Sequence, residues 1–261
     1  MVLSEMTWQQ VNELDRSTVV LVPFGAMEQH GLHMPLETDS LIATELARRL
    51  DEACGRSLLV APTQWLGLST HHMSYSGTIS ASVETYLALT TEILSSIAQA
   101  GFKKILVLNA HGGNVSALDV VLTKCRLMHP ETRIVLVTYW NAAAQEIAEI
   151  RESLPGGMGH ACELETSLVM VAKPHAVLTG LMEPDGRWSQ SEFLGKDMLI
   201  GGAASVSRTF ADVSRNGAVG DPRTASAEKG RLFFDAIVSR LASLVADLES
   251  GKIDSFRAVG D

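Results

Sequence analysis

Two short stretches of the 261-residue sequence gather side chains that hold metal ions and move protons in many proteins. The first stretch carries Glu28, His30 and Asp39, and the second carries His111. Glu28 and His30 stand two residues apart, so in an extended segment their side chains point to the same side. Such a pair can serve one divalent ion or two, and a further carboxylate such as Asp39 can bridge two ions. Imidazole and oxygen ligands favour Zn²⁺ or Mn²⁺, with Fe²⁺ as a further candidate, over a thiolate site.

A third stretch, GHACELETS at residues 159–167, adds His160, Glu163 and Glu165 ahead of an apolar run. Acids at the start of a helix also stabilise its dipole, by about 0.3–1 kcal/mol each. That structural role is the preferred interpretation for at least one of the two glutamates.

Each of these signals has an ordinary explanation when taken alone. Glu28 fits a surface carboxylate, Asp39 fits a helix N-cap, and His111 fits a histidine in a turn. Residues 112–114 (GGN) also fit an anion-binding loop at a helix N-terminus. The joint occurrence of the polar clusters after two predicted strands favours a functional site over these separate explanations.

Other polar and aromatic residues are weaker candidates. Adjacent histidines at 71 and 72 point apart in an extended chain, which argues against a shared role. His33 is predicted to orient a neighbouring side chain of the site without contacting a metal itself. Trp140 fits a pocket wall and core packing equally well. The predicted substrate-binding residues are Gly112, Trp140, Ser76 and Gly77.

The clusters are placed by a regular alternation of strands and helices. Four short apolar runs predict strands at residues 18–24, 57–61, 104–108 and 133–138. Helical spacing predicts helices at residues 40–50, 83–100, 115–128 and 225–249, and Thr7 with Gln10 predicts a capping box before a short first helix. This alternation indicates an α/β fold with a mostly parallel sheet. Ligands bind beyond the carboxyl ends of such strands, where both polar clusters fall.

Residues 173–224 are rich in glycine, proline, serine and aspartate and predict a long irregular segment, which is either functional or disordered. No linker composition is visible, so we expect a single domain over residues 1–261.

Composition excludes some partners. A net charge of −9 disfavours nucleic acid and anionic membranes. The sequence has no run long and apolar enough for a membrane span and no secretory signal. Three cysteines without paired spacing indicate a reducing compartment. We therefore expect a cytoplasmic enzyme acting on a small molecule.

Several motifs together resemble the creatininase (creatinine amidohydrolase) family. They are GAMEQHGLHMPLETD at residues 25–39, LNAHGGN at 108–114, HACELETS at 160–167 and GAVGDP at 217–222. The resemblance implies a three-layer α/β/α sandwich that assembles as a homo-oligomer, commonly a hexamer. It also implies two divalent ions, one held by Glu28 and His111, the other by His30, with Asp39 bridging them.

The resemblance leaves one ligand open. Creatininase itself has an acid where this chain has Gly113, and an apolar residue where this chain has Glu163. We therefore predict Glu163 as the replacement ligand, with Glu165 as a second-shell or helix-start group.

The implied reaction is hydrolysis of a C–N bond by a hydroxide that bridges the two metals. His160 is the predicted proton-transfer residue, as acid toward the leaving nitrogen or as base toward water. The aromatic residues that enclose creatinine in creatininase are replaced by GGMG at residues 156–159, which disfavours creatinine. A small cyclic amide or formamide is the leading substrate class, and the alternatives within the family are peptide trimming and keto-sugar ring hydrolysis.

A non-catalytic module that binds phosphate at residues 112–114 is the rival function. It leaves the clustering of Glu28, His30 and Asp39 without an explanation. Two equivalents of metal in the purified protein would favour the hydrolase over this module.

Overall fold

A parallel sheet of four strands forms the centre of the computed structural model, which describes residues 1–256. The strand order is β2-β1-β3-β4, and each neighbouring pair is parallel. The strands are β1 (Val19–Phe24), β2 (Leu59–Val60), β3 (Lys104–Asn109) and β4 (Arg133–Thr138). In the register, Val22 pairs with Val107, which pairs in turn with Leu136.

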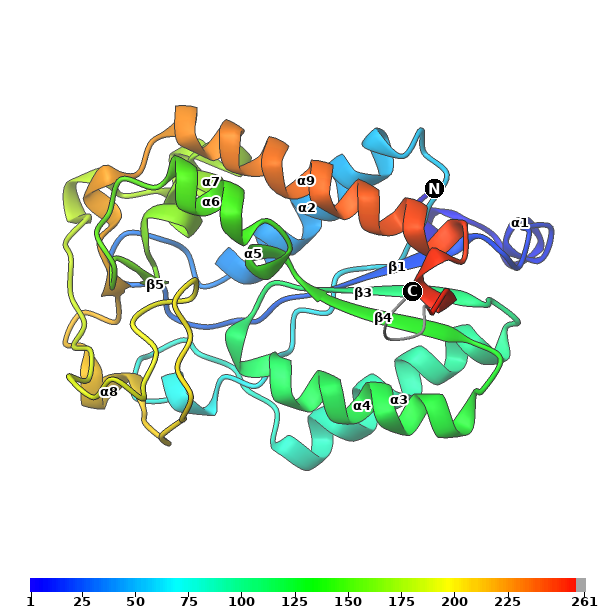
Figure 1. Cartoon of the computed structure of the whole chain (residues 1–261), viewed down its shortest axis with the longest axis horizontal. Coiled ribbons are helices and arrows are strands. Elements are labelled where there is room, and N and C mark those ends of the chain that lie inside the picture. The colour runs from blue at the N-terminus through cyan, green and yellow to red at the C-terminus, as the bar shows by residue number, and fades with distance from the viewer. Residues whose placement is uncertain (257–261) are drawn as a thin grey trace.

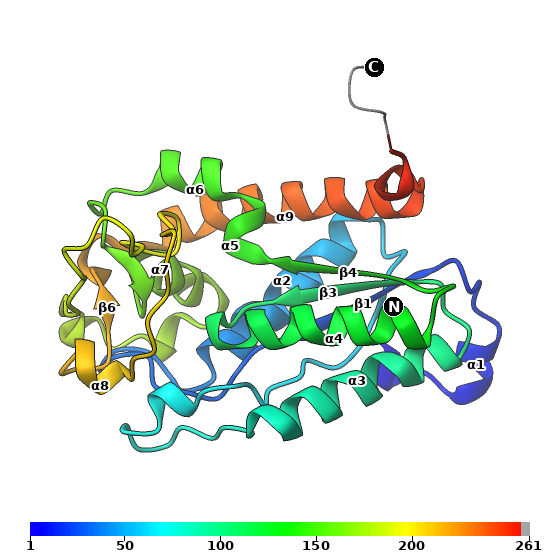
Figure 2. The ribbon, with the colours of Figure 1, turned by 60° about the horizontal axis from the view of Figure 1, so that its bottom comes forward.

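Helices cover both faces of this sheet, as Figure 1 shows. One face packs against α2, α5, α6, α7 and α9, and the opposite face packs against α3 and α4, which also lie side by side in Figure 2. The helices are α1 (Trp8–Asn12), α2 (Thr38–Ala53), α3 (Val83–Gln99), α4 (Val115–Met128), α5 (Tyr139–Ala142), α6 (Ala144–Ile150), α7 (Glu163–Ala172), α8 (Phe210–Val213) and α9 (Ala227–Glu249). The prediction of a three-layer α/β/α sandwich is therefore confirmed.

Alternation along the strands creates two apolar cores. Successive side chains of a strand point to opposite faces, so Leu21 and Leu106 enter the core under α2 and α9. Val20 and Val107 enter the other core, under α3 and α4. Both faces are buried, which explains why these strands are apolar without interruption.

Most predicted elements agree with the structure, including the capping box between Thr7 and Gln10. The second strand is shorter than predicted: only Leu59 and Val60 pair with β1, and Val60 also forms an isolated bridge with Val2 on its other side. The Ala61 amide still donates to the Leu21 carbonyl. The last helix begins at Ala227 rather than Ala225, since the Ser226 side chain caps it.

The segment at residues 173–224 is mostly irregular, as predicted, and lies at the carboxyl end of the sheet (Figure 1). It contributes α8 and the short strand β6 (Val219–Gly220), which pairs antiparallel with β5 (Met158–His160). None of the helices in the described part of the chain is both long and apolar enough to cross a membrane. The single-domain organisation stays a prediction, and residues 257–261 of that predicted domain lie outside the described residues.

Candidate metal centre and active site

A close backbone contact brings the first polar stretch beside the start of α2. A Cβ atom on Gly25 would lie 2.5 Å from the Cα of Ser40, a distance that nonbonded carbons do not reach. The Ser40 hydroxyl also donates to the Ala26 carbonyl over 2.9 Å. Glycine at position 25 thus allows the chain leaving β1 to place Glu28 and His30 next to Asp39.

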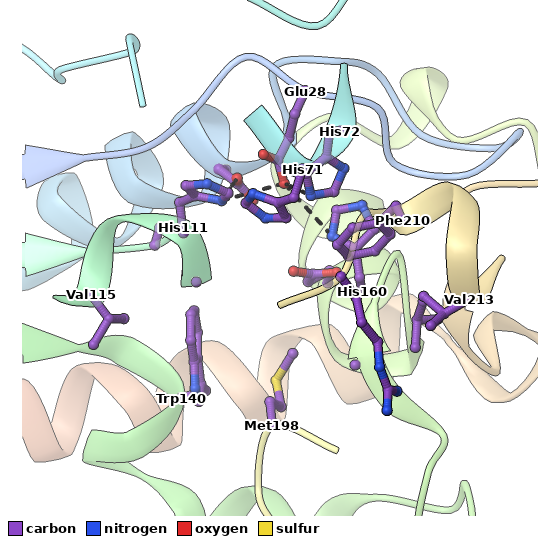
Figure 3. A pocket seen from close by; sticks show the side chains of 18 of the residues that line it. Glu28, His71, His72, His111, Val115, Trp140, His160, Met198, Phe210 and Val213 are labelled. Carbon is purple, nitrogen blue, oxygen red and sulfur yellow. Dashed lines mark ion pairs between the residues drawn. The ribbon is translucent and has the colours of Figure 1, made fainter. Parts of the chain in front are cut away.

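The buried side chains of Glu28, His30, Asp39 and His111 converge at this point. Figure 3 shows Glu28 and His111 among the residues that line the adjoining cavity. His30 Nε2 lies 3.0 Å from Asp39 Oδ1, and His111 Nδ1 lies 3.0 Å from Asp39 Oδ2. His111 Nδ1 is also 3.3 Å from Glu28 Oε1. One oxygen of Asp39 therefore faces each histidine, which is the arrangement a bridging carboxylate requires.

Backbone carbonyls determine which nitrogen of each ring faces the carboxylates. His111 Nε2 donates to the Leu68 carbonyl at 3.0 Å, and His30 Nδ1 donates to the Glu28 carbonyl at 3.2 Å. In a neutral ring the remaining nitrogen then has a lone pair aimed at a carboxylate oxygen. Two such contacts are repulsive unless a cation lies between the atoms. Metal-ligating histidines typically donate their second nitrogen to a carbonyl in this way.

In the protein without metal, protonation of His30 and His111 provides the positive charge between these atoms. Burial lowers the pKa of His30, but the charge and hydrogen bond of Asp39 outweigh burial and raise that pKa to about 9. Burial also opposes ionisation of Asp39, yet His30 and His111 hold its pKa below the ordinary value. The pKa of His111 is raised well above its ordinary value, since Glu28 and Asp39 overcome the effect of burial.

Glu165, and not Glu163, joins this cluster. His30, His160 and Glu165 offer ligand atoms that all lie within 4.8 Å of one another, and a second such group contains Glu28, Asp39 and His111. Burial, with Asp39 adding to it and His30 opposing it, raises the pKa of Glu165 to about 7.

Glu163 points to the other side of α7. Residues two apart on a helix lie about 200° apart around its axis, so the two glutamates face nearly opposite directions. Glu163 Oε1 pairs with Lys229 Nζ at 2.7 Å, and its carboxylate accepts the backbone amides of Glu152 and Ser153. This placement corrects the expectation that Glu163 is the replacement ligand, because all its interactions are made away from the cluster.

The backbone at Gly113 has no room for a side chain. A Cβ there would lie 2.2 Å from the Leu68 carbonyl oxygen and 2.4 Å from His111 Nε2. A side chain at this position would therefore disrupt the hydrogen bond that orients His111. The His111 geometry and an acid at position 113 exclude each other in this backbone arrangement.

The amide of Gln29 fixes the protonation pattern of two further histidines. Its Oε1 accepts from the Gly31 amide at 2.9 Å, and its Nε2 donates to the Gly217 carbonyl at 3.0 Å. Because a flipped amide would lose both bonds, the second Nε2 hydrogen must point to His72 Nδ1, 2.9 Å away. His72 then carries its proton on Nε2, 3.2 Å from Glu28 Oε1. His72 is thus a hydrogen-bond donor to Glu28 in this form and is unsuited to bind a metal through that nitrogen.

His160 has the opposite arrangement. Its Nε2 donates to the Gln29 backbone carbonyl at 2.7 Å, so Nδ1 keeps its lone pair and faces Glu28 Oε1 at 3.8 Å. Burial, reinforced by the positive charge of His30, lowers the pKa of His160 well below its ordinary value. The ring is therefore neutral and has a proton-accepting nitrogen inside the site.

Substitution of Gln29 by glutamate tests this assignment. A carboxylate at position 29 accepts hydrogen bonds and cannot donate, so His72 is expected to move its proton from Nε2 to Nδ1. Long-range ¹H–¹⁵N correlation spectra of the imidazoles report this change directly. The control variant Gln64→Glu, at a half-buried position, should leave the His72 signals unaltered. A wild-type His72 that already carries the proton on Nδ1 would contradict the assignment.

A cavity of about 620 Å³ opens onto the cluster. Of the four residues predicted to bind substrate, Gly112 and Trp140 line this cavity, whereas Ser76 and Gly77 are exposed and lie outside its lining; their role in binding stays a prediction. His33 also lies outside the lining, where its Nε2 contacts Thr166 Oγ1, next to Glu165, at 2.9 Å.

Aromatic walls come from the irregular segment. Trp188 occupies the space beside Gly159, whose Cβ would lie 2.9 Å from the indole ring, and donates to the Gly156 carbonyl at 2.8 Å. Phe210 stacks on His72 with ring centroids 3.8 Å apart and contacts His160 (Figure 3). The cavity therefore has aromatic walls, although positions 156 and 159 are glycines.

Sequence reasoning missed the role of His71 and His72. Residues 70–72 form a 3₁₀ turn, in which successive side chains differ by about 120° rather than the 180° of a strand. Both rings therefore line the cavity, with centroids 4.4 Å apart. Short turns of this kind carry no periodic sequence signal that would have identified them.

The fold and the cluster around Asp39 together define the class of the protein. It is an α/β protein with a site of imidazoles and carboxylates at the carboxyl edge of a parallel sheet. The family model for creatininase, described as creatinine amidohydrolase, matches residues 4–245. The chain belongs to the creatininase family, which includes hydrolases that act on C–N bonds.

Known proteins of this family resemble the chain over most of its length. A mycofactocin precursor peptide peptidase of Mycobacterium ulcerans is 33% identical over 235 residues, covering 87% of this chain and 84% of the relative. A creatinine amidohydrolase of Pseudomonas putida is 26% identical, covering 94% and 96%. The solved structure of a manganese form of creatininase superposes with a TM-score of 0.76 at 25% identity, covering 94% of this chain and 97% of that one.

Proposed function

We propose that this protein is a metal-dependent hydrolase that cleaves the C–N bond of an amide with two divalent ions. The observation that carries the proposal is a crowd of buried ligand atoms. Glu28 Oε2 is buried and accepts no hydrogen bond, and nitrogens of His30 and His111 each lie 3.0 Å from an oxygen of Asp39. Divalent cations would neutralise these contacts.

Five residues would hold the two ions. Glu28, His111 and Asp39 Oδ2 would bind the first ion, and His30, Glu165 and Asp39 Oδ1 would bind the second. Their nitrogen and oxygen donors suit Zn²⁺ and Mn²⁺. The manganese form of a creatininase, 25% identical to this chain, supports the same choice.

Bound ions of this kind supply an activated water and polarise the substrate carbonyl. The chain supplies the proton transfer, because His160 Nδ1 is unprotonated and faces the cluster. We propose that it accepts a proton from the attacking water and delivers it to the leaving nitrogen. His72 Nε2–H orients Glu28, and Phe210 shields both imidazoles from water.

Among possible substrates, the amide of a short peptide is favoured. The peptide peptidases, at 33% identity, are more similar to this chain than the creatinine amidohydrolase at 26%. The second candidate substrate class is that of small cyclic amides and formamides, the leading class in the sequence analysis. Keto-sugar rings are the third candidate class.

A paired measurement tests the proposal. Metal-loaded protein is expected to hydrolyse at least one compound among short peptides, formamidopyrimidines and cyclic amides, and chelator-treated protein should recover this activity on addition of Mn²⁺ or Zn²⁺. Activity unaffected by complete metal removal would contradict the proposal. A protein that binds no metal but retains inorganic phosphate would favour the anion-binding module at residues 112–114.

Assembly as a hexamer and location in the cytoplasm stay predictions.

A further inference from the structure

Two arginines stand in the cavity that contains the proposed metal site. Arg187 and Arg208 are the only lysine or arginine side chains in its lining. Both side chains are exposed, and among residues 1–256 neither guanidinium has a carboxylate oxygen within 4.0 Å, so no internal ion pair neutralises them. Both belong to the irregular segment that follows α7.

The nearest acids along the chain are occupied elsewhere. Asp185 Oδ2 accepts the amides of Arg215 and Asn216, at 2.7 and 2.9 Å, and the Ser214 hydroxyl. Asp212 Oδ2 accepts the amide of Thr209 at 2.7 Å and its hydroxyl at 2.9 Å. These bonds fix the loop backbone, and neither acid forms an ion pair with the two arginines. The hydrogen bonds from Thr209 and, to a smaller extent, the charge of Arg208 lower the pKa of Asp212.

Neighbouring aromatic residues anchor each arginine to the walls of the site. Arg187 precedes Trp188, whose indole is hydrogen-bonded to Gly156 and packs at Gly159. Arg208 precedes the capping box that starts α8, where Phe210 stacks on His72. The guanidinium groups are therefore attached to backbone that is held against the proposed catalytic residues.

The overall charge makes this local concentration of positive charge informative. A chain with a net charge of −9 repels small anions on average, and a local pair of cationic side chains favours the binding of one. Guanidinium groups bind carboxylate and phosphate oxygens through paired donors. Building on the proposed function, we propose that Arg187 and Arg208 form a subsite for an anionic group, a carboxylate or a phosphate, at the end of the substrate away from the scissile amide.

Binding of two-headed probes tests this subsite. The probes are dicarboxylates from glutarate to suberate, the matched methyl-ketone acids with one neutral end, and 4-phosphonobutyrate. Affinities are measured by calorimetry on metal-loaded protein at low ionic strength. One acidic end of each probe can occupy the metal site, so the comparison isolates the charge at the other end.

Wild-type protein is expected to bind the best dicarboxylate or the phosphonate about 10- to 100-fold more tightly than the matched ketone acid. The R187Q/R208Q double variant should lose this preference. Arg215→Gln is the control, because Arg215 is exposed in the same segment and lies outside the cavity lining. If the double variant loses more affinity for the phosphonate, the subsite binds phosphate. If it loses more affinity for the dicarboxylate, the subsite binds carboxylate.

Equal binding of charged and neutral probes by the wild type, or a preference retained in the double variant, would overturn the subsite. Metal content measured on the same samples separates this result from the proposed function. Protein with two ions and no preference contradicts only the subsite. An arginine-dependent preference in protein that binds no metal supports the subsite and contradicts the metal-dependent mechanism.

Discussion

Replacement of Asp39 by alanine is expected to empty both metal positions. Asp39 offers Oδ1 to the position of His30 and Oδ2 to that of His111, each at 3.0 Å, so its loss removes one ligand from both ions. Metal content should fall from about two equivalents to near zero. Activity should fall by ~10³-fold or more, since hydrolysis loses its electrostatic stabilisation. Elemental analysis of the purified variant measures the first effect and steady-state kinetics the second.

Two further variants make this result specific. Asp39→Asn keeps the size of the side chain but removes its charge, and it should lose most of the metal too. Asp197→Asn is the matched control, because Asp197 is buried and paired with Arg151 outside the cluster. Full occupancy of both positions in Asp39→Ala would show that Asp39 does not bridge them.

Glu165→Gln is expected to deplete one ion and leave the other. Glu165 shares its group with His30 and His160, whereas the first position keeps Glu28 and His111. Metal content should fall to about one equivalent, with activity lowered by ~10²-fold or more. Elemental analysis after dialysis against metal-free buffer, followed by kinetics at saturating metal, separates the two effects.

Glu163→Gln should give the opposite pattern. The variant keeps both ions but leaves Lys229 without its buried partner, so the free energy of unfolding should fall by about 3–5 kcal/mol. Lys229 and Ser153 hold the pKa of Glu163 below its ordinary value against the effect of burial. Its contribution to stability is therefore present above the unfolded-state pKa and lost as pH falls through the folded-state value. Loss of metal in Glu163→Gln with full retention in Glu165→Gln would reverse our assignment.

The two glutamates also show where sequence reasoning ends. Apolar runs that alternate with helical segments predicted the parallel sheet, because both faces of the sheet are buried and its strands are apolar without interruption. The three layers were implied by the family resemblance. The positions of Glu28, His30, Asp39 and His111 followed from their places after β1 and β3. The choice between Glu163 and Glu165 depended on how α7 is rotated about its own axis relative to the sheet. This rotation is determined by packing against α9 and by the ion pair between Lys229 and Glu163. Neither contact can be predicted from a local sequence pattern.

Long-range contacts also limited the prediction of the cavity. Gln29, His72 and Gly217 come together over 188 residues of sequence separation, so their hydrogen-bond network has no local signature. Trp188 fills the space that Gly156 and Gly159 leave, whereas the sequence offered only Trp140 as an aromatic wall. The irregular segment was recognised as functional or disordered, but its contacts with the site required the tertiary structure.

Anomalous scattering from crystals grown with Mn²⁺ or Zn²⁺ tests the central claim most directly. We predict two metal peaks, one between Glu28 and His111 and one between His30 and Glu165, with the Asp39 carboxylate bridging them. An absence of metal at this cluster under saturating Mn²⁺ and Zn²⁺, or a single ion bound by Glu163, would contradict the account.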